Sequence, residues 1–154
     1  ALDERIALTV ANQAGCGGSG PSRHDDPQAE TVGRISDKYG YWFCPNFAEF
    51  GADPARLPFD QHALVALYAP RPVLFTAAAD DAWANPSGQF AVLRAATPVY
   101  RLLGVAGLDA PALPQPGDPL VASRLGYWIR PGAHAFTPAD WQSYMDFADR
   151  WLRR

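Results

Sequence analysis

Short apolar runs alternate with amphipathic segments along this chain. Three of the runs have the length and composition of buried strands: residues 6–11 (IALTVA), 72–78 (PVLFTAA) and 125–130 (LGYWIR). Apolar residues follow one another there without strict alternation, which is typical of parallel strands covered on both faces. We therefore expect a mostly parallel sheet, with residues 6–11 as a central strand.

Segments with apolar residues at helical spacing lie between and after these runs: residues 30–39, 60–68, 86–103 and 138–152. Asp60 is placed to cap the second helix, and Pro98 is expected to break or kink the third. The last helix is expected to turn these side chains inward: Trp141, Tyr144, Phe147, Ala148 and Trp151. The order of strands and helices predicts an α/β fold with helices on the faces of the sheet, and we treat residues 1–154 as a portion of one domain.

The composition argues against two classes of partner. The formal net charge is −3 and the 13 Lys and Arg residues are scattered, so we expect no nucleic-acid partner. No apolar run approaches the roughly 18 to 20 residues that cross a bilayer, so we expect no membrane partner. The sequence starts without Met directly before a strand-like run, and we expect it to be the downstream part of a longer protein.

Cys16 and Cys44 are the only cysteines, and two interpretations of them stay open. In an exported protein they form a disulfide that closes a loop of about 28 residues and adds about 3 kcal/mol of stability. In a cytosolic protein they are buried thiols. The disulfide is the favoured alternative of the two. Neither these cysteines nor His24 and His62 have the spacing of a recognised metal site, and both histidines are expected to be structural or exposed.

Two loops at strand ends carry a candidate acid and a candidate base. Residues 79–86 (ADDAWANP) follow the second strand, and residues 130–134 (RPGAH) follow the third. Acid before histidine is the order found in α/β-hydrolases, where the histidine takes a proton from a nucleophile and the carboxylate fixes its tautomer. His134 is the candidate base, although a lone histidine also serves as a cap or in packing. Asp81 is preferred to Asp80 because a short turn and a helix-starting proline follow it.

The nucleophile for this pair is missing from the sequence. Residues 12–21 form a glycine-rich loop that contains Ser19, but Pro21 breaks the G-x-S-x-G elbow, and the spacing of a phosphate cradle is absent too. The other serines and both cysteines stand in no such elbow. The aromatic residues at 41–43 are expected to pack under this loop.

Several stretches, taken together and in order, resemble the C-terminal half of a glucuronoyl esterase catalytic domain, carbohydrate esterase family fifteen. They are residues 3–7 (DERIA), 12–18 (NQAGCGG), 30–35 (ETVGRI), 42–44 (WFC), 57–62 (LPFDQH), 69–72 (APRP), 81–86 (DAWANP) and 131–134 (PGAH). The resemblance implies a three-layer α/β-hydrolase-like fold. It also implies a secreted or periplasmic serine esterase, without a metal or other cofactor, that acts on esters between lignin alcohols and the 4-O-methylglucuronic acid groups of glucuronoxylan.

The same resemblance implies roles for individual residues. His134 becomes the general base and Asp81 the acid. The family's other acid position holds Gln13, which cannot serve as a carboxylate and is expected to be a hydrogen-bonding neighbour. The implied sugar-binding residues are Trp83, Glu30 and Arg34. The nucleophilic serine, with an arginine and a lysine near it, is expected upstream of the first residue, so the upstream half is a required partner and the chain alone is expected to be inactive.

Two other functions stay open. The first is a different esterase on the same fold, specific for acetyl xylan or feruloyl esters, because loops set the acyl and alcohol pockets. The second is a non-catalytic remnant that binds carbohydrate through Trp83 and the aromatic residues at 41–43. A serine hydroxyl within about 3 Å of the His134 ring favours catalysis over the remnant.

Overall fold

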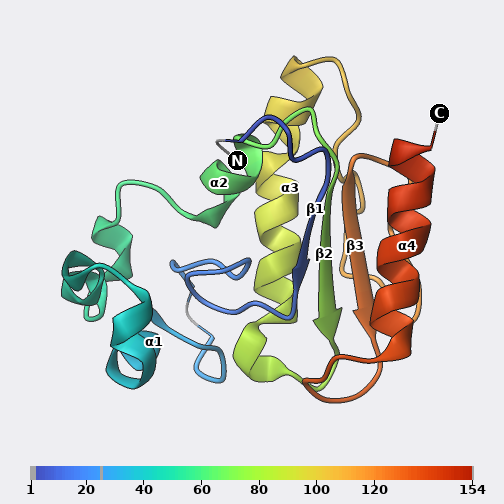
Figure 1. The fold of residues 1–154 in the computed structure, drawn as a ribbon. Helices are drawn as coiled ribbons and strands as arrows, with labels where there is room; N and C mark the ends of the chain where they lie inside the picture. The colour runs from blue at the N-terminus through green and yellow to red at the C-terminus, as the bar shows by residue number, and fades with distance from the viewer. Residues whose placement is uncertain (1–2, 25, 154) are drawn as a thin grey trace.

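A parallel sheet lies between two helical layers (Figure 1). The computed structural model describes residues 3–24 and 26–153. Its strands are β1 (Thr9–Asn12), β2 (Val73–Ala78) and β3 (Leu125–Arg130), which pair in parallel in the order β1-β2-β3. The predicted α/β class is confirmed. β1 is half-buried and lies at one end of the described sheet, so our expectation of a central strand covered on both faces is wrong for this part of the chain.

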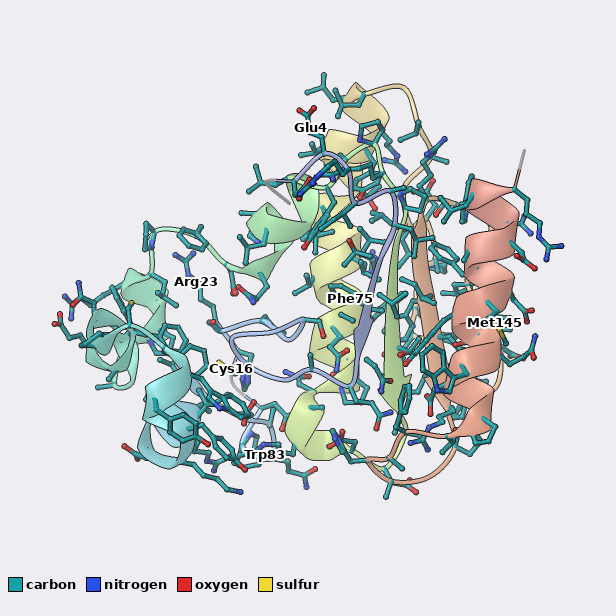
Figure 2. The ribbon with its side chains drawn as sticks, in the orientation of Figure 1. Glu4, Cys16, Arg23, Phe75, Trp83 and Met145 are labelled. Atoms are coloured by element: carbon teal, nitrogen blue, oxygen red, sulfur yellow. The ribbon has the colours of Figure 1, made fainter. Side chains whose placement is uncertain are left out.

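The two faces of the sheet are covered by different helices. Phe75 of β2 belongs to a core shared with α3 (Pro86–Leu102) on one face (Figure 2). On the opposite face Gly126 of β3 leaves room for Phe147 of α4 (Pro138–Leu152), because a Cβ atom at this glycine would lie 2.6 Å from the phenyl ring. The absence of a side chain at this position therefore lets α4 close onto the sheet.

Two details of the helices differ from the sequence-based expectation. α3 continues through Pro98, which is exposed, so the predicted break is wrong. Trp141 is 56% exposed and does not belong to the inner face of α4. The buried stripe of that helix runs through Asp140 and Phe147, and Trp141 lies about 100° around the helix from Asp140.

A smaller helical region separates β1 from β2. It contains, in chain order, α1 (Val32–Tyr39), the 3₁₀ helices η1 (Gly40–Trp42), η2 (Pro45–Phe50) and η3 (Pro54–Arg56), and α2 (Gln61–Ala66). The 3₁₀ helices were not predicted, because they are short and rich in Pro and aromatic residues without a clear period. Asp60 caps α2, as expected, and its carboxylate also accepts the backbone N–H groups of Ser22 and Arg23 at 2.8 and 3.0 Å.

The aromatic residues after α1 divide into two groups. The ring of Phe43 lies against Gly17, as expected for packing under the glycine-rich loop. Tyr41 and Trp42 are exposed, and Trp42 stacks on Tyr39 with ring centroids 4.4 Å apart. Our expectation is therefore wrong for these two residues, because their side chains are exposed and not packed under the glycine-rich loop.

Both cysteines are free thiols, so the favoured disulfide is wrong. Cys16 is buried with Val32 and Ile35 under α1, whereas Cys44 is exposed before η2. Burial raises the pKa of the Cys16 thiol to about 11. No helix in the described part of the chain combines the length and the apolar character needed to cross a membrane.

Candidate active site

The candidate acid and base meet at the carboxyl ends of β2 and β3. Oδ2 of Asp81 lies 2.7 Å from Nδ1 of His134. The Asp81 side chain is 6% exposed and the His134 side chain 68%. Because a carboxylate can only accept, Nδ1 carries the proton of the neutral imidazole and the lone pair lies on Nε2. This is the tautomer that a general base requires.

Local structure fixes Asp81 in this position. Its other oxygen, Oδ1, accepts the backbone N–H of Ala84 at 3.2 Å, so Asp81 is the N-cap of the 3₁₀ helix η4 (Ala82–Ala84). Asp80 is exposed, and its backbone N–H donates to the Gly132 carbonyl at 3.1 Å. The structure therefore brings Asp81 rather than Asp80 to His134, while the backbone of Asp80 ties the two loops together.

The loop that carries His134 surrounds a buried guanidinium. Arg130, the last residue of β3, lies 3.3 Å from a carboxylate oxygen of Asp140, and both side chains are buried. The guanidinium also donates to the carbonyls of Pro131, Ala133 and Ala135 at 2.9, 2.8 and 2.9 Å. Our sequence reasoning missed Arg130. The available signal was an arginine at a strand end with an acidic residue in the first turn of the next helix.

Glu30 and Trp83 form a second pair beside the acid and base. The indole Nε1–H of Trp83 donates to Oε1 of Glu30 at 2.9 Å, and the Glu30 backbone N–H donates to the Trp83 carbonyl at 2.9 Å. Burial raises the pKa of Glu30. The guanidinium of Arg34 lies 5.8 Å from the centroid of the Trp83 ring and donates to the carbonyls of Pro27 and Ala29.

One cavity of about 790 Å³ joins these groups, and Figure 2 shows Cys16 and Trp83 on this side of the molecule, between α1 and the start of α3. Four of the five predicted site residues line it, and Arg34 does not. The sequence reasoning had not assigned Lys38 or Tyr39 to the site, and it had named Trp42 only for the alternative of a carbohydrate-binding remnant. The full lining is Gln13 to Gly18, Glu30, Ile35, Lys38, Tyr39, Trp42, Phe43, Asp81, Trp83, Ala84 and His134.

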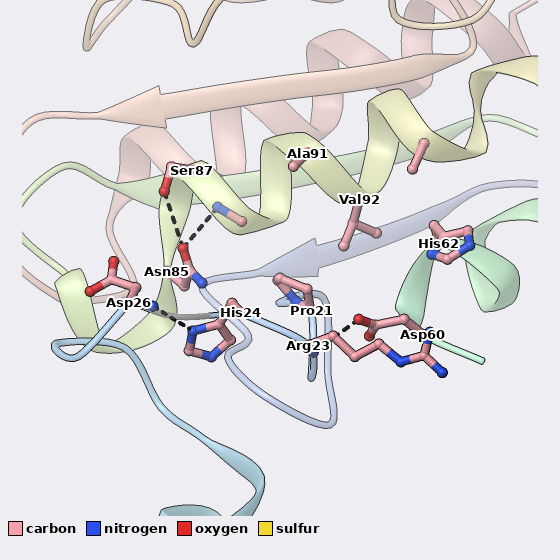
Figure 3. A pocket seen from close by; sticks show the side chains of 12 residues that line it. Pro21, Arg23, His24, Asp26, Asp60, His62, Asn85, Ser87, Ala91 and Val92 are labelled. Atoms are coloured by element: carbon pink, nitrogen blue, oxygen red, sulfur yellow. Dashed lines mark hydrogen bonds between the residues drawn. The ribbon is translucent and has the colours of Figure 1, made fainter. Parts of the chain in front are cut away.

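His24 and His62 line a different cavity of about 440 Å³, shown in Figure 3. The Asp26 backbone N–H donates to Nδ1 of His24 at 3.2 Å, and Nε2 lies 2.9 Å from the Glu30 carbonyl. Both ring nitrogens of His24 thus hold loop backbone, which agrees with a structural role. Within residues 3–24 and 26–153, no group of three or more His, Cys, Asp or Glu side chains is arranged to hold a metal ion.

Comparison with known proteins identifies the family. A sequence model described as "Glucuronyl esterase, fungi" matches residues 1–104. The chain belongs to the glucuronoyl esterase family. Among curated proteins, carbohydrate esterase MZ0003 from an unknown prokaryotic organism is 48% identical over 149 residues, which are 97% of this chain and 34% of that protein. A 4-O-methyl-glucuronoyl methylesterase of Phanerochaete carnosa is 33% identical over 110 residues, 68% of this chain and 27% of that protein.

Solved structures of this glucuronoyl esterase family share the fold. A promiscuous CE15 esterase from a marine bacterial metagenome superposes with a TM-score of 0.93 at 45% identity, over 98% of this chain and 37% of that one. A CE15 glucuronoyl esterase from Teredinibacter turnerae gives 0.87 at 33% identity, over 96% and 36%. The resemblance inferred from the sequence is therefore confirmed. The chain spans about a third of the length of the relatives it matches.

Proposed function

We propose that this chain is the C-terminal portion of a serine-type carbohydrate esterase that cleaves esters of 4-O-methylglucuronic acid, between glucuronoxylan and lignin alcohols. The observation that supports this proposal most strongly is the 2.7 Å contact between Asp81 and His134, which line one cavity together with Glu30 and Trp83. Membership of the glucuronoyl esterase family supports the choice of ester.

In the proposed mechanism a serine from a preceding segment attacks the ester carbonyl, and Nε2 of His134 takes its proton. His134 then gives this proton to the leaving alcohol, and the acyl-enzyme is resolved by water that His134 activates in turn. Asp81 holds the imidazole in the required tautomer and stabilises the imidazolium. The chain alone is inactive in this scheme, because the serine lies outside it. The scheme needs no metal or organic cofactor.

We assign the uronic acid to the wall formed by Trp83 and Glu30. The exposed face of the indole suits the apolar face of a sugar ring, and the Glu30 carboxylate suits its hydroxyls. Arg34, which lies outside the cavity lining, contributes through its contact with the Trp83 ring. A polymeric substrate of plant cell walls requires a secreted or periplasmic enzyme, so we propose that location too.

A broader esterase is the second candidate, since a relative of 45% identity is described as promiscuous. Both candidates are tested with the complete protein, in which the preceding segment is restored. Initial rates are measured on a benzyl ester of 4-O-methylglucuronate, on acetylated xylan and on a feruloyl ester. Faster cleavage of the glucuronate ester supports the first candidate, and faster cleavage of either other ester supports the second.

The catalytic assignment is tested with His134→Ala and a matched control, His62→Ala. The first is expected to lower kcat by about 10⁴-fold or more, because loss of the base disables the nucleophile. The control removes a histidine from the other cavity and is expected to keep the parent rate. Turnover by His134→Ala at the parent rate would overturn the assignment, and a parent protein inactive on all three esters would favour the non-catalytic remnant.

A further inference from the structure

The loop that carries His134 buries no apolar side chain, and its ring contacts are confined to Phe136, whose ring centroid lies 5.2 Å from that of Trp141 and 6.0 Å from that of Tyr144. Pro131 and the residues from Ala133 to Phe136 are exposed, and Gly132 is half-buried. A loop without buried side chains is ordered only as far as polar contacts order it. Between Gly132 and Ala135, before the Phe136 ring meets α4, we therefore expect polar contacts to hold the backbone.

Gln13 supplies two of these contacts from a different strand. Its Nε2 donates to the carbonyl of Ala135 at 2.7 Å, and its Oε1 accepts the Ala135 N–H at 3.0 Å. One planar amide thus contacts both backbone polar groups of Ala135, the residue after His134, and the Arg130 guanidinium shares its carbonyl at 2.9 Å. Oε1 also lies 3.4 Å from the Arg130 guanidinium, which joins Gln13 to the buried ion pair of Arg130 and Asp140.

The backbone of Gln13 is unusual for a residue with a side chain. Its φ is +48°, in the left-handed region that non-glycine residues seldom adopt. The residue is buried, with only 4% of its surface exposed. The residue directly follows β1, and its own N–H donates to the Thr76 carbonyl of β2 at 2.7 Å. Such a conformation is unfavourable for a residue with a Cβ atom and persists only where surrounding contacts hold it.

We infer that Gln13 is a positioning residue for His134. This inference rests on the proposed function. Asp81 fixes the imidazole at Nδ1, and Gln13 fixes the backbone one residue further on. With both contacts in place, Nε2 has one direction relative to the cavity. Without Gln13 the ring stays paired with Asp81 but pivots about that contact, so Nε2 points at the serine for a smaller fraction of the time.

The chemistry of the contact explains the residue type. The backbone of Ala135 presents one donor, its N–H, and one acceptor, its carbonyl. A side chain that contacts both must offer an acceptor and a donor side by side. A side-chain amide does so, and Gln reaches further than Asn. A carboxylate offers acceptors alone, and would keep the contacts with the Ala135 N–H and with Arg130 while facing the Ala135 carbonyl with a negative oxygen.

The test uses the complete protein with Gln13→Leu, Gln13→Glu and the control Gln142→Leu. Gln142 is exposed on α4 and donates to Asp146 at 2.7 Å, so the control removes an amide contact away from the site. On the glucuronate ester, Gln13→Leu is expected to lower kcat about 10- to 100-fold and to change KM less than about 3-fold. Gln13→Glu is expected to fall between the parent and Gln13→Leu, and the control to match the parent.

The split between kcat and KM separates positioning from mere support of the fold. Rates are measured well below each variant's melting temperature, where a purely structural role leaves the kcat of the folded enzyme unchanged. A folded Gln13→Leu enzyme with kcat within 2-fold of the parent overturns the inference. If that variant does not fold, Gln13→Glu decides, and a kcat equal to or above that of the parent overturns the inference.

A second readout distinguishes failure of this inference from failure of the proposed function. A fluorophosphonate probe labels an activated serine without using any sugar ester. If the parent cleaves no glucuronate ester but is labelled in a His134-dependent way, the proposed substrate is wrong, and the labelling rates of the Gln13 variants still decide the inference. If labelling does not depend on His134, both the proposed function and the positioning role of Gln13 are wrong.

Discussion

The sheet and the helical region between β1 and β2 differ in how much apolar surface they bury. Phe75, Leu93 and Tyr127 belong to an extended core between the sheet and α3. Around α1, in contrast, the buried apolar cluster of the described residues is small, with Cys16, Val32 and Ile35 at its centre. Asp81 and His134 follow strands of the larger core, whereas Glu30 belongs to the smaller region. The proposed acid and base are thus attached to the larger core, and Glu30 of the proposed sugar wall to the smaller region, where we expect local opening to require less free energy.

Asp81→Asn tests the acid that is attached to the larger core, and it is expected to have the largest effect of these substitutions. An amide in place of the carboxylate reverses the imidazole tautomer, so kcat is expected to fall about 10⁴-fold while KM changes little. Steady-state kinetics on the complete protein with a glucuronate ester measures this. Asp80→Asn is the control, since Asp80 is exposed and contributes its backbone rather than its carboxylate. Equal losses in both variants would contradict the assignment of the acid.

Leu93→Ala and Ile35→Ala test whether the two regions unfold separately. Leu93 is fully buried in the larger core, so its truncation is expected to lower the free energy of global unfolding by about 2 to 5 kcal/mol. Ile35 is buried in the smaller cluster, and its truncation is expected to speed amide hydrogen exchange in α1 before β2 is affected. Urea unfolding and hydrogen exchange measure the two effects. If Ile35→Ala deprotects α1 and β2 together, the regions unfold as one unit.

Trp83→Leu tests the wall between the two regions. It removes the indole face and the hydrogen bond to Glu30, so KM for the glucuronate ester is expected to rise about 10-fold, equivalent to about 1.4 kcal/mol, with a smaller change in kcat. Trp151→Leu is the control, because Trp151 lies in the last turn of α4, at the end of that helix away from the His134 loop. A parent-like KM for Trp83→Leu would remove this residue from the sugar site.

Glu30→Gln is expected to give the smallest effect, and its sign depends on pH. Burial raises the pKa of Glu30 above its ordinary value in the folded protein. Stability from this group is therefore complete below the ordinary pKa and is lost as pH rises through the folded pKa. Gln keeps the oxygen that accepts from Trp83 but does not ionise, so the variant should gain stability relative to the parent as pH rises from about 4 to 7.

Urea midpoints across this pH range measure the gain in stability, and Glu49→Gln, at an exposed position, is the control. A difference independent of pH would contradict the role of ionisation.

The order of elements was predictable, because apolar runs and helix caps record it locally. β3 and α4 have the bounds that the sequence indicated, since Pro131 and Pro138 mark their limits. The pairing of Asp81 with His134 was also foreseen, because the carboxyl ends of adjacent parallel strands meet at one edge of the sheet. These features depend on residues close together in sequence, or on strand order alone.

What could not be predicted depends on contacts between distant residues. The left-handed backbone of Gln13 and its contact with Ala135 join positions 122 apart, and no local pattern encodes them. Arg130 has the residue type of a surface position but is buried by its ion pair with Asp140. The outward position of Trp141 follows from which side of α4 faces the sheet, and its apolar character pointed the other way.

The place of β1 at one end of the described sheet has a practical consequence. Its four residues, Thr-Val-Ala-Asn, include no charge and no proline. One row of its backbone groups pairs with β2, and no strand within residues 3–24 and 26–153 pairs with the other row. An unguarded edge of this kind templates the addition of foreign strands. Recombinant production of these 154 residues by themselves is thus expected to give aggregates at high concentration, and a partner strand or a lysine on that edge is the remedy.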